Sequence, residues 1–235
     1  FGLTQVRKER EAGVRRFRFI AQGPLVNEPG LLFRPTLEEI INASTIDPDG
    51  FQIRESTRPT DNYTATQDLD AWFIEGDMEL SSSFRLLAGV RNEKSTQNVR
   101  TFDLFKPDVA IAAALESDDL FPVVTGTYIL DQYDMQLRAG YSETISRPDF
   151  RELSPAYFTH PVTGLTIVGN PDLTVAYIKN YDTRWEWYFS ADESISVGLF
   201  YKEFDSPIEA IIKPGPTLER TFINAQDATT YGIEF

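Results

Sequence analysis

The chain has 235 residues, of which 41% are hydrophobic and 13% aromatic, and its formal net charge is −14. This length allows one large β domain or two ordinary domains, and the acidic charge argues against nucleic acid as a partner. No apolar run approaches the roughly 20 residues that a membrane-spanning helix needs. The absence of cysteine excludes disulfides and thiolate metal sites.

The first part of the chain predicts one strand and one helical turn. Residues 1–9 read as a strand, and Val14–Ile20 would extend it. The start lacks the basic and apolar regions of a signal peptide, and both ends of the chain read as cut from a longer protein. In residues 35–41 a capping residue at Thr36, acids in the first turn and apolar residues on one face predict a helical turn.

Strict alternation of apolar and polar residues is the strongest signal in the chain. From Tyr133 to Ile145 the odd positions are mostly apolar and the even positions are polar or small, which is the two-residue period of a strand. The pattern recurs along the chain, and a helical period fits none of these runs. About nine strands are predicted: 1–9, 63–80, 84–100, 120–130, 133–145, 178–189, 195–204, 219–224 and 229–235.

Short and long connections are predicted to alternate along the chain. The hairpin-length connections are Ser81–Ser83, Asp131–Gln132, Ser190–Ser194 and Asn224–Thr229. The long connections are Glu9–Asn62, Thr101–Asp119, Ser146–Ile178 and Asp205–Arg220. Within one of them, Val109–Glu116 has high helix propensity and predicts a second helical turn. Tight turns on one rim and long loops on the other are typical of a transmembrane β-barrel.

These patterns together predict an all-β fold, an antiparallel up-and-down β-barrel fragment with long extracellular loops. The odd positions of residues 133–145 would face lipid and the even positions water. Several strands exceed the roughly 10 residues that cross the hydrocarbon, so the wall is expected to rise above the membrane. Trp185, Trp187, Tyr188 and Phe189 lie beside a short turn and predict an aromatic girdle, with the core of a soluble sandwich as the alternative.

Several motifs occur in the order found in one transporter family. YSETISRPDFRELSPAYF, GNPDL, NYDTRWEWYFS and SVGLFYKEFDSPIE, between Tyr141 and Glu209, resemble the barrel region of TonB-dependent outer-membrane receptors. Residues 224–235 are similar to the next hairpin of that family, and the resemblance extends from about Thr57 to the end of the chain. It implies a barrel of about 22 strands around a plug domain, in the outer membrane of a Gram-negative bacterium.

The resemblance also implies a function. Such receptors import scarce ligands, such as a ferric siderophore, cobalamin or an oligosaccharide, with energy from the TonB complex. The plug and the TonB box are absent from this sequence, so residues 1–235 are expected to be part of a barrel domain. Contacts with the TonB complex would then lie in segments outside these residues, and outer-membrane lipid would surround the wall.

The loop after residues 133–145 holds the candidate site residues. Arg147, Asp149, Arg151 and Glu152 are predicted to form a salt-bridge network that fixes the exit of this loop, with ligand contact as the alternative. Gly169–Leu173 reads as a turn that clamps the loop, since Gly and Asn tolerate positive φ and Pro fixes the next residue.

Tyr157, Phe158 and His160 are the candidates for ligand contact from this extracellular loop, because flat rings suit sugar or chelate faces. His160 is the only histidine, and one histidine without neighbouring ligands is weak evidence for metal, so a solvated loop residue is its alternative. No metal site and no cofactor are expected. No nucleophile elbow, P-loop or dinucleotide fingerprint is present, so no catalytic residue is expected either and the chain is not predicted to be an enzyme.

Two other function classes stay open at this point. A soluble β-sheet carbohydrate-binding module would explain the alternation and the aromatic residues, but several long loops count against a compact soluble domain. An acidic, β-rich glycoside hydrolase would rest only on the abundance of carboxylates, which is common in any acidic chain.

Overall fold

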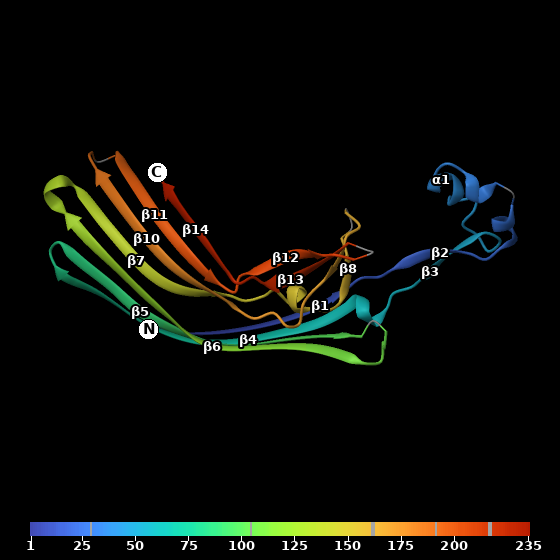
Figure 1. Ribbon diagram of the computed structural model, residues 1–235, viewed down its shortest axis with the longest axis horizontal. Helices are drawn as coiled ribbons and strands as arrows, with labels where there is room; N and C mark the ends of the chain where they lie inside the picture. Colours follow the sequence, from blue (N-terminus) through green and yellow to red (C-terminus); the bar gives the residue numbers. More distant parts are fainter. Residues whose placement is uncertain (29, 104, 161–162, 191, 216–217) are drawn as a thin grey trace.

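The computed structural model describes residues 1–28, 30–103, 105–160, 163–190, 192–215 and 218–235. Its main element is an eight-stranded sheet with the order β1-β4-β5-β6-β7-β10-β11-β14 (Figure 1). The strands are β1 (Gly2–Gly13), β4 (Asn62–Ser81), β5 (Phe84–Phe102), β6 (Ala110–Leu130), β7 (Met135–Ser146), β10 (Ala176–Tyr188), β11 (Ser194–Asp205) and β14 (Asp227–Glu234). Every neighbouring pair is antiparallel, and the order in the sheet follows the chain, which confirms the up-and-down fold.

A second layer covers one face of the main sheet. It consists of the four-stranded sheet β12-β13-β9-β8 and the short helix α2 (Phe150–Leu153), which lie over β4 to β6 (Figure 1). The four strands are β8 (Tyr157–Thr159), β9 (Thr166–Val168), β12 (Ile208–Lys213) and β13 (Glu219–Asn224). The layers share one buried cluster: Tyr63, Ala65, Val99, Ala113, Phe150, Leu153 and Leu173. We call the covered face of the main sheet the inner face and the opposite one the outer face.

The chain between β1 and β4 forms an arm that stands away from the main sheet (Figure 1). Its stem is a ribbon of β2 (Phe17–Ala21) paired with β3 (Phe51–Glu55). Its tip carries η1 (Pro24–Asn27), η2 (Leu31–Phe33) and α1 (Leu37–Ile40). The predicted helical turn is confirmed, because the Thr36 hydroxyl accepts a hydrogen bond from the Glu39 N–H at the start of α1. The predicted extension of β1 is instead the separate strand β2.

Two further 3-10 turns, η3 (Pro59–Asp61) and η4 (Asp131–Tyr133), complete the helical elements of the described residues. None of the helices there is long and apolar enough to cross a membrane.

The predicted helical turn at Val109–Glu116 is wrong. These residues lie in β6, which pairs with β5 from Phe102 opposite Ala110 to Phe84 opposite Tyr128. Helix propensity is a weak preference, and a ladder of cross-strand hydrogen bonds over the whole length of β5 outweighs it. The connection from β5 to β6 is therefore the short segment 103–109, and the strict alternation of short and long connections is wrong as well.

The predicted hairpin across Asn224–Thr229 is also wrong. β13 before it pairs with β12 and β9 in the second layer, whereas β14 after it pairs with β11 in the main sheet. β12 lies within a connection that was predicted to be a loop. The other three hairpin connections are confirmed, since β4–β5, β6–β7 and β10–β11 are neighbouring strands. At the second of them, Asp134 adopts a left-handed φ of 50°.

The outer face of the main sheet divides into an apolar and a polar part. On β4, Trp72, Ile74, Met78 and Leu80 are exposed, whereas the residues above them on the same face, from Asp70 back to Thr64, are polar. Together with their partners on the other strands they form an exposed apolar belt: Leu3, Trp72, Ile74, Met78, Leu80, Leu120, Val124, Tyr128, Leu137, Tyr181, Trp187, Ile195, Leu199, Tyr201, Tyr231 and Ile233. We call this set the outer belt.

The upper boundary of the outer belt follows the strand register. Across β7, β10, β11 and β14 it is a row of four tyrosines in register: Tyr141, Tyr181, Tyr201 and Tyr231. The rings of the first three lie 5.1 and 6.0 Å apart between centroids. The next outward row is charged or polar: Glu143, Lys179, Glu203 and Thr229. On the other four strands the corresponding polar row is Gln5, Asp70, Lys94 and Asp118.

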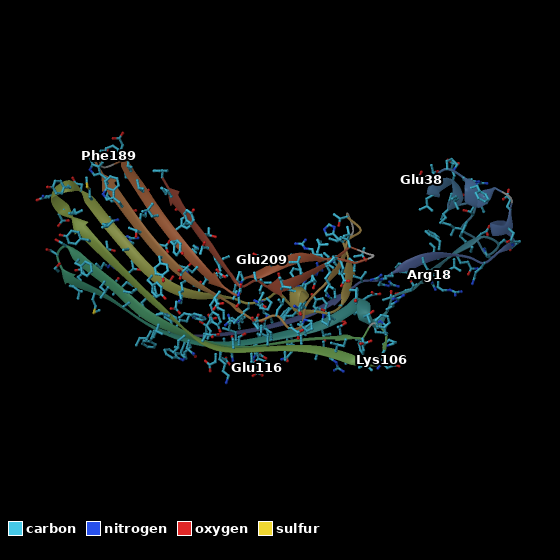
Figure 2. The ribbon with its side chains drawn as sticks, viewed as in Figure 1. Arg18, Glu38, Lys106, Glu116, Phe189 and Glu209 are labelled. Atoms are coloured by element: carbon cyan, nitrogen blue, oxygen red, sulfur yellow. The ribbon has the colours of Figure 1, made fainter. Side chains whose placement is uncertain are left out.

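Aromatic side chains also mark the lower end of the outer belt. The Trp187 ring lies 6.5 Å from the Trp185 ring and 5.2 Å from the Phe189 ring, measured between centroids. Phe189 lies at the turn end of the sheet, and Lys106 lies toward the opposite end, where β5 meets β6 (Figure 2). Over β10 the belt is thus bounded by aromatic rings at both ends.

Candidate functional site

The segment after β7 turns inward and packs on the inner face. Leu153 and Ser154, at the end of α2, are almost fully buried, and Phe150 joins the cluster shared with β4, β5 and β6. The side-chain amide of Gln97 on β5 donates to the Pro148 carbonyl at 3.1 Å and so fixes the start of the segment. This brings Arg147 and Asp149 into contact with β5 and β1 of the main sheet.

Arg147 is the most buried of the four. Its Nη1 donates to Glu93 Oε2 on β5 at 2.8 Å, and the two side chains are only 13% and 14% exposed. The other carboxylate oxygen of Glu93 accepts from Arg91 Nε at 2.7 Å. Burial alone would raise the pKa of Glu93, but the hydrogen bonds from Arg91 and Arg147 outweigh it and hold this pKa below its usual value.

Asp149 and Glu152 cap α2. Asp149 Oδ1 accepts from the Arg151 N–H at 2.9 Å, and Glu152 Oε2 accepts from the Asp149 N–H at 2.8 Å. This reciprocal arrangement is a capping box, which satisfies free backbone donors at the first turn. Asp149 also pairs with Arg10 of β1 at 3.4 Å.

Arg151 has an aromatic partner. Its guanidinium carbon lies 4.3 Å from the centroid of the Phe158 ring on β8, which is the geometry of a cation–π contact. Among the described residues, no ion pair joins two of the four predicted residues to each other. Their partners lie instead on β1, β5 and β8.

The Gly169–Leu173 turn lies against the back of α2. The Gly169 N–H donates to the Ser154 carbonyl at 2.9 Å, and the Asn170 N–H donates to the Glu152 carbonyl at 2.6 Å. The Asn170 side chain reaches further, to the Phe222 carbonyl of β13 at 3.0 Å. The turn therefore joins α2 to the second sheet.

Tyr157 and Phe158 belong to β8 and are half-buried. They line a small cavity of about 50 Å³ together with residues of β1, β4 and α2. Burial, and after it the charge of Glu219, raises the pKa of the Tyr157 hydroxyl. His160 lies beyond β8 at a turn, where its Nδ1 accepts from the Thr163 N–H at 3.2 Å. His160 does not line this small cavity.

A larger cavity of about 670 Å³ lies on the inner face, below the first turn of α2. It is lined by Val6, Lys8, Glu9 and Arg10 of β1, Gln67 and Leu69 of β4, Gln97 of β5, and Arg147, Pro148, Asp149, Phe150 and Glu152. Three of the four predicted loop-exit residues therefore border it, and Tyr157, Phe158 and His160 do not.

The two halves of the main sheet separate beside this cavity. β6 and β7 pair only from Val123 opposite Ser142 to Leu130 opposite Met135. Among the described residues, no strand pairs with the rest of β6 on that side. Side chains bridge the gap, since the Tyr177 hydroxyl of β10 donates to Asp119 Oδ1 of β6 at 2.8 Å. Burial, and then this hydrogen bond, raises the pKa of Tyr177.

Comparison with known proteins assigns this architecture to a family. The sequence profile described as "TonB dependent receptor-like, beta-barrel" matches residues 25–235, which is most of the chain. The chain belongs to this family. No curated protein sequence matches the chain.

Solved structures with a similar fold include two receptors. One is the siderophore receptor PirA from Pseudomonas aeruginosa, with 13% identity and a TM-score of 0.50, matching over 78% of this chain and 40% of that one. The other is the hemophore receptor HasR of Serratia marcescens, solved with its hemophore HasA and heme, with 10% identity and a TM-score of 0.60, over 98% and 38%. The chain thus spans about two fifths of the length of these receptors.

In this TonB-dependent receptor-like barrel, the strand residues that line the larger cavity were not predicted from the sequence. Lys8, Gln67 and Gln97 lie on strands that were predicted, at inward positions of the two-residue period. The two-residue period of the strands is therefore enough to predict that these side chains point inward. Their meeting with Arg147 depended on the inward turn of the α2 segment, for which the sequence carries no periodic signal.

Proposed function

We propose that this chain is part of the wall of an outer-membrane receptor that imports a scarce ligand. Family membership over residues 25–235 carries this proposal. It also favours a receptor over a soluble carbohydrate-binding module. The outer belt supports it independently, because an exposed apolar band bordered by aromatic rings is typical of a barrel wall in lipid.

The height of the outer belt fits a bilayer. From Trp72 to Leu80, β4 spans about 26 Å at roughly 3.3 Å per residue. These nine residues match the length of a tilted strand that crosses the hydrocarbon, which is about 9–11 residues. β4, β5 and β6 then continue about 26 Å beyond the polar row. We infer that this part stands outside the outer membrane of a Gram-negative cell, with the arm and the second layer on the extracellular side.

The domain assignment follows from the sheet. β1 and β14 are its two edges, and they do not pair with each other within the described residues. We propose that residues 1–235 are part of a barrel of about 22 strands, whose other strands and plug domain belong to the rest of the protein. Contact with the TonB complex would occur through those other segments.

The ligand is proposed to be a ferric siderophore, cobalamin or an oligosaccharide. PirA is a siderophore receptor, which supports the first of these. Tyr157, Phe158 and His160 are proposed as ligand contacts from the extracellular loop. Arg147, Asp149, Arg151 and Glu152 are proposed to hold that loop in place, because the first three anchor the α2 segment to β5, β1 and β8 and Glu152 caps α2.

A deletion of the full-length gene tests this function. Cells lacking it should lose energy-dependent uptake of one radiolabelled ligand class among ferric siderophores, cobalamin and oligosaccharides, and a plasmid copy should restore uptake. Uptake should also stop when the proton gradient is collapsed. Recovery of the full-length protein in the soluble fraction, or unchanged uptake of all three classes, would contradict the proposal.

A further inference from the structure

The upper part of β6 is a sheet edge within the wall. The ladder between β6 and β7 stops where β6 reaches Pro122, which has no N–H to donate. β7 itself ends at Ser146, where the chain turns inward toward α2. By the same register Ser146 is level with Asp119, so within the described residues no strand pairs with Ala110–Asp118 on this side. We call Ala110–Asp118 the free edge.

The free edge offers a row of unpaired backbone groups. Its other side pairs with β5, but on this side no backbone N–H or carbonyl of Ala110–Asp118 bonds to another backbone group in the part of the chain that the structure describes. Such a row is a template for pairing with an extended chain, and many proteins bind peptides by adding them to a sheet edge. Strands that continue the wall beyond β1 and β14 would not cover it, because β6 lies in the middle of the strand order.

The side chains of the free edge alternate between an apolar inner side and a polar outer side. On the inner side, Ala113 is 3% exposed in the cluster shared with the second layer, and Ile111 and Leu115 beside it are half-buried. On the outer side, Glu116 is exposed and projects away from the second layer (Figure 2). A chain added here would therefore extend the cluster with apolar side chains on its inner side.

Glu116 is an acid without an ion-pair partner among the described residues. It stands opposite Thr96 of β5, whereas Asp118 below it stands opposite Lys94 and accepts from the Asn92 side chain at 2.9 Å. Glu116 is thus the acid that remains for a basic side chain on the vacant side. Opposite charges on neighbouring strands stabilise their pairing.

Two polar atoms at the foot of the free edge are buried and unpaired. Ser117 Oγ and Asp119 Oδ2 have no hydrogen-bond partner in the described part of the chain, although Asp119 Oδ1 accepts from the Tyr177 hydroxyl. Buried polar atoms without partners raise the free energy of the protein. Polar groups of an added chain at this level would offset that cost.

We propose that the free edge binds an extended segment of another polypeptide as an additional antiparallel strand of the wall. Every second side chain of this segment is apolar and packs toward Ile111 and Leu115, and the side chains between them are polar. A Lys or Arg of the polar set lies opposite Glu116. It belongs to the N-terminal half of the segment, because an antiparallel partner of β6 runs from the level of Asp118 to that of Ala110. The inference goes beyond the proposed function, since this partner is a polypeptide on the wall and not the imported ligand.

A synthetic peptide with this pattern tests the proposal on the full-length receptor in detergent. The probe is fluorescently labelled Lys-Val-Lys-Val-Thr-Val-Thr-Val with a blocked C-terminus, and its anisotropy should rise to saturation as receptor is added. In a paired strand, alternate N–H groups point to opposite sides. N-methylation of either the Val amides or the Lys and Thr amides should therefore abolish binding, and N-methylation of the other set should preserve it.

Variants of the receptor test the position of the peptide. Glu116→Lys should weaken binding by about three- to tenfold, because like charges then lie opposite each other. Glu38→Lys in α1 is the control, since it changes the net charge equally on the distant arm. Residues 1–235 contain no cysteine, so a single one can report proximity. With Cys at the first Thr of the peptide, Ala114→Cys should form a disulfide with it, whereas Asn98→Cys, opposite Ala114 on β5, should not.

The proposal is overturned if wild-type receptor does not bind the peptide, or if the two N-methylated peptides behave alike. It is also overturned if Glu38→Lys weakens binding as much as Glu116→Lys, or if Asn98→Cys forms the disulfide as readily as Ala114→Cys. A disulfide between two receptors that carry Ala114→Cys, formed without peptide, would assign the free edge to a second copy of the chain and would likewise overturn it.

Discussion

The Arg147–Glu93 pair is the most consequential contact at the scale of single residues. It joins the chain after β7 to β5 at a level where β6 and β7 no longer pair. Both side chains are largely buried, so each neutralises a charge that water does not reach. Removing one partner should therefore cost far more than removing one partner of an exposed pair.

Replacement of Arg147 by Met should lower the free energy of unfolding by about 3–5 kcal/mol, because it leaves the buried Glu93 carboxylate without one of its two guanidinium partners. Glu93→Gln should cost a similar amount, because it leaves the buried Arg147 guanidinium without its carboxylate. Urea unfolding of the full-length protein in liposomes measures both. Arg7→Met is the control, because the Arg7–Asp68 pair is 74% and 62% exposed and should matter by less than about 1 kcal/mol. Similar losses for Arg147→Met and Arg7→Met would refute this account.

The Arg15–Glu55 pair at the base of the arm predicts a pH effect. Hydrogen bonds from Arg15 and then from Thr57 lower the pKa of Glu55 to about 2, from 4.5 in the absence of partners. A lowered pKa means that the pair stabilises the ribbon above pH 4.5, and that this contribution is lost as the pH falls through about 2. The ¹³C shift of the Glu55 carboxyl carbon should titrate accordingly, and Arg15→Met should move its midpoint up. An unchanged midpoint in that variant would show that the pair does not form.

At the scale of elements, the contact between the Gly169 turn and α2 depends on the absence of a side chain. A Cβ at Gly169 would lie 2.3 Å from the Ser154 carbonyl oxygen, and 2.5 and 2.6 Å from those of Glu152 and Arg151. These are backbone atoms at the end of a helix, so they cannot move aside without breaking its hydrogen bonds.

Gly169→Ala should consequently destabilise the α2 segment by about 1–3 kcal/mol, and limited proteolysis of the full-length protein should cut within residues 147–175 more rapidly. Gly76→Ala is the matched control, because a Cβ there meets no atom within 4 Å. Equal proteolysis of the two variants would mean that the turn does not clamp α2.

If the outer belt faces lipid, the cost of placing a charge on the outer face should depend on its depth in the membrane. Leu199 lies in mid-belt, between the Val197 and Tyr201 positions of β11, and is 51% exposed. Leu199→Arg should lower the free energy of unfolding from liposomes by about 2–4 kcal/mol, as expected near the centre of a bilayer. Thr96→Arg is on the same outer face but beyond the polar row, so it should cost at most about 1 kcal/mol. If both variants unfold alike, the belt does not face lipid.

At the scale of the whole molecule, the open edges of the main sheet dominate. β1 and β14 each have a partner on one side only, so each presents a row of unpaired backbone N–H and C=O groups. The outer belt adds a large exposed apolar surface, which soluble monomeric proteins rarely have. In a complete barrel within a membrane, β1 and β14 would pair with further strands and the outer belt would contact lipid.

Residues 1–235 produced alone should therefore oligomerise or exchange strands, through β1, β14 and the outer belt. Sedimentation velocity in detergent-free buffer measures this, and detergent should reduce association by covering the belt while the edges continue to pair. A monodisperse, folded monomer without detergent would contradict the prediction.

The existence and facing of the wall strands could be predicted from the sequence, and their partners could only partly be predicted. The nine predicted strands all occur, because a two-residue period is a local property that each segment displays by itself. The short strands β3, β8, β9 and β12 were missed, since three to six residues are too few for a period to show. The start of β6 was misjudged because its alanines favour a helix in isolation.

The sequence by itself determined that this protein has an alternating wall with an apolar outer face, and motifs that place it in one family. The tertiary structure decided that β13 leaves the wall for the second layer, that Val109–Glu116 is strand, and that α2 packs inside against β5. It also decided that Lys8, Gln97 and Arg147, far apart in the chain, border one cavity. The physical reason is that facing follows from local periodicity, whereas strand partners and layer contacts are fixed by non-local hydrogen bonds and packing.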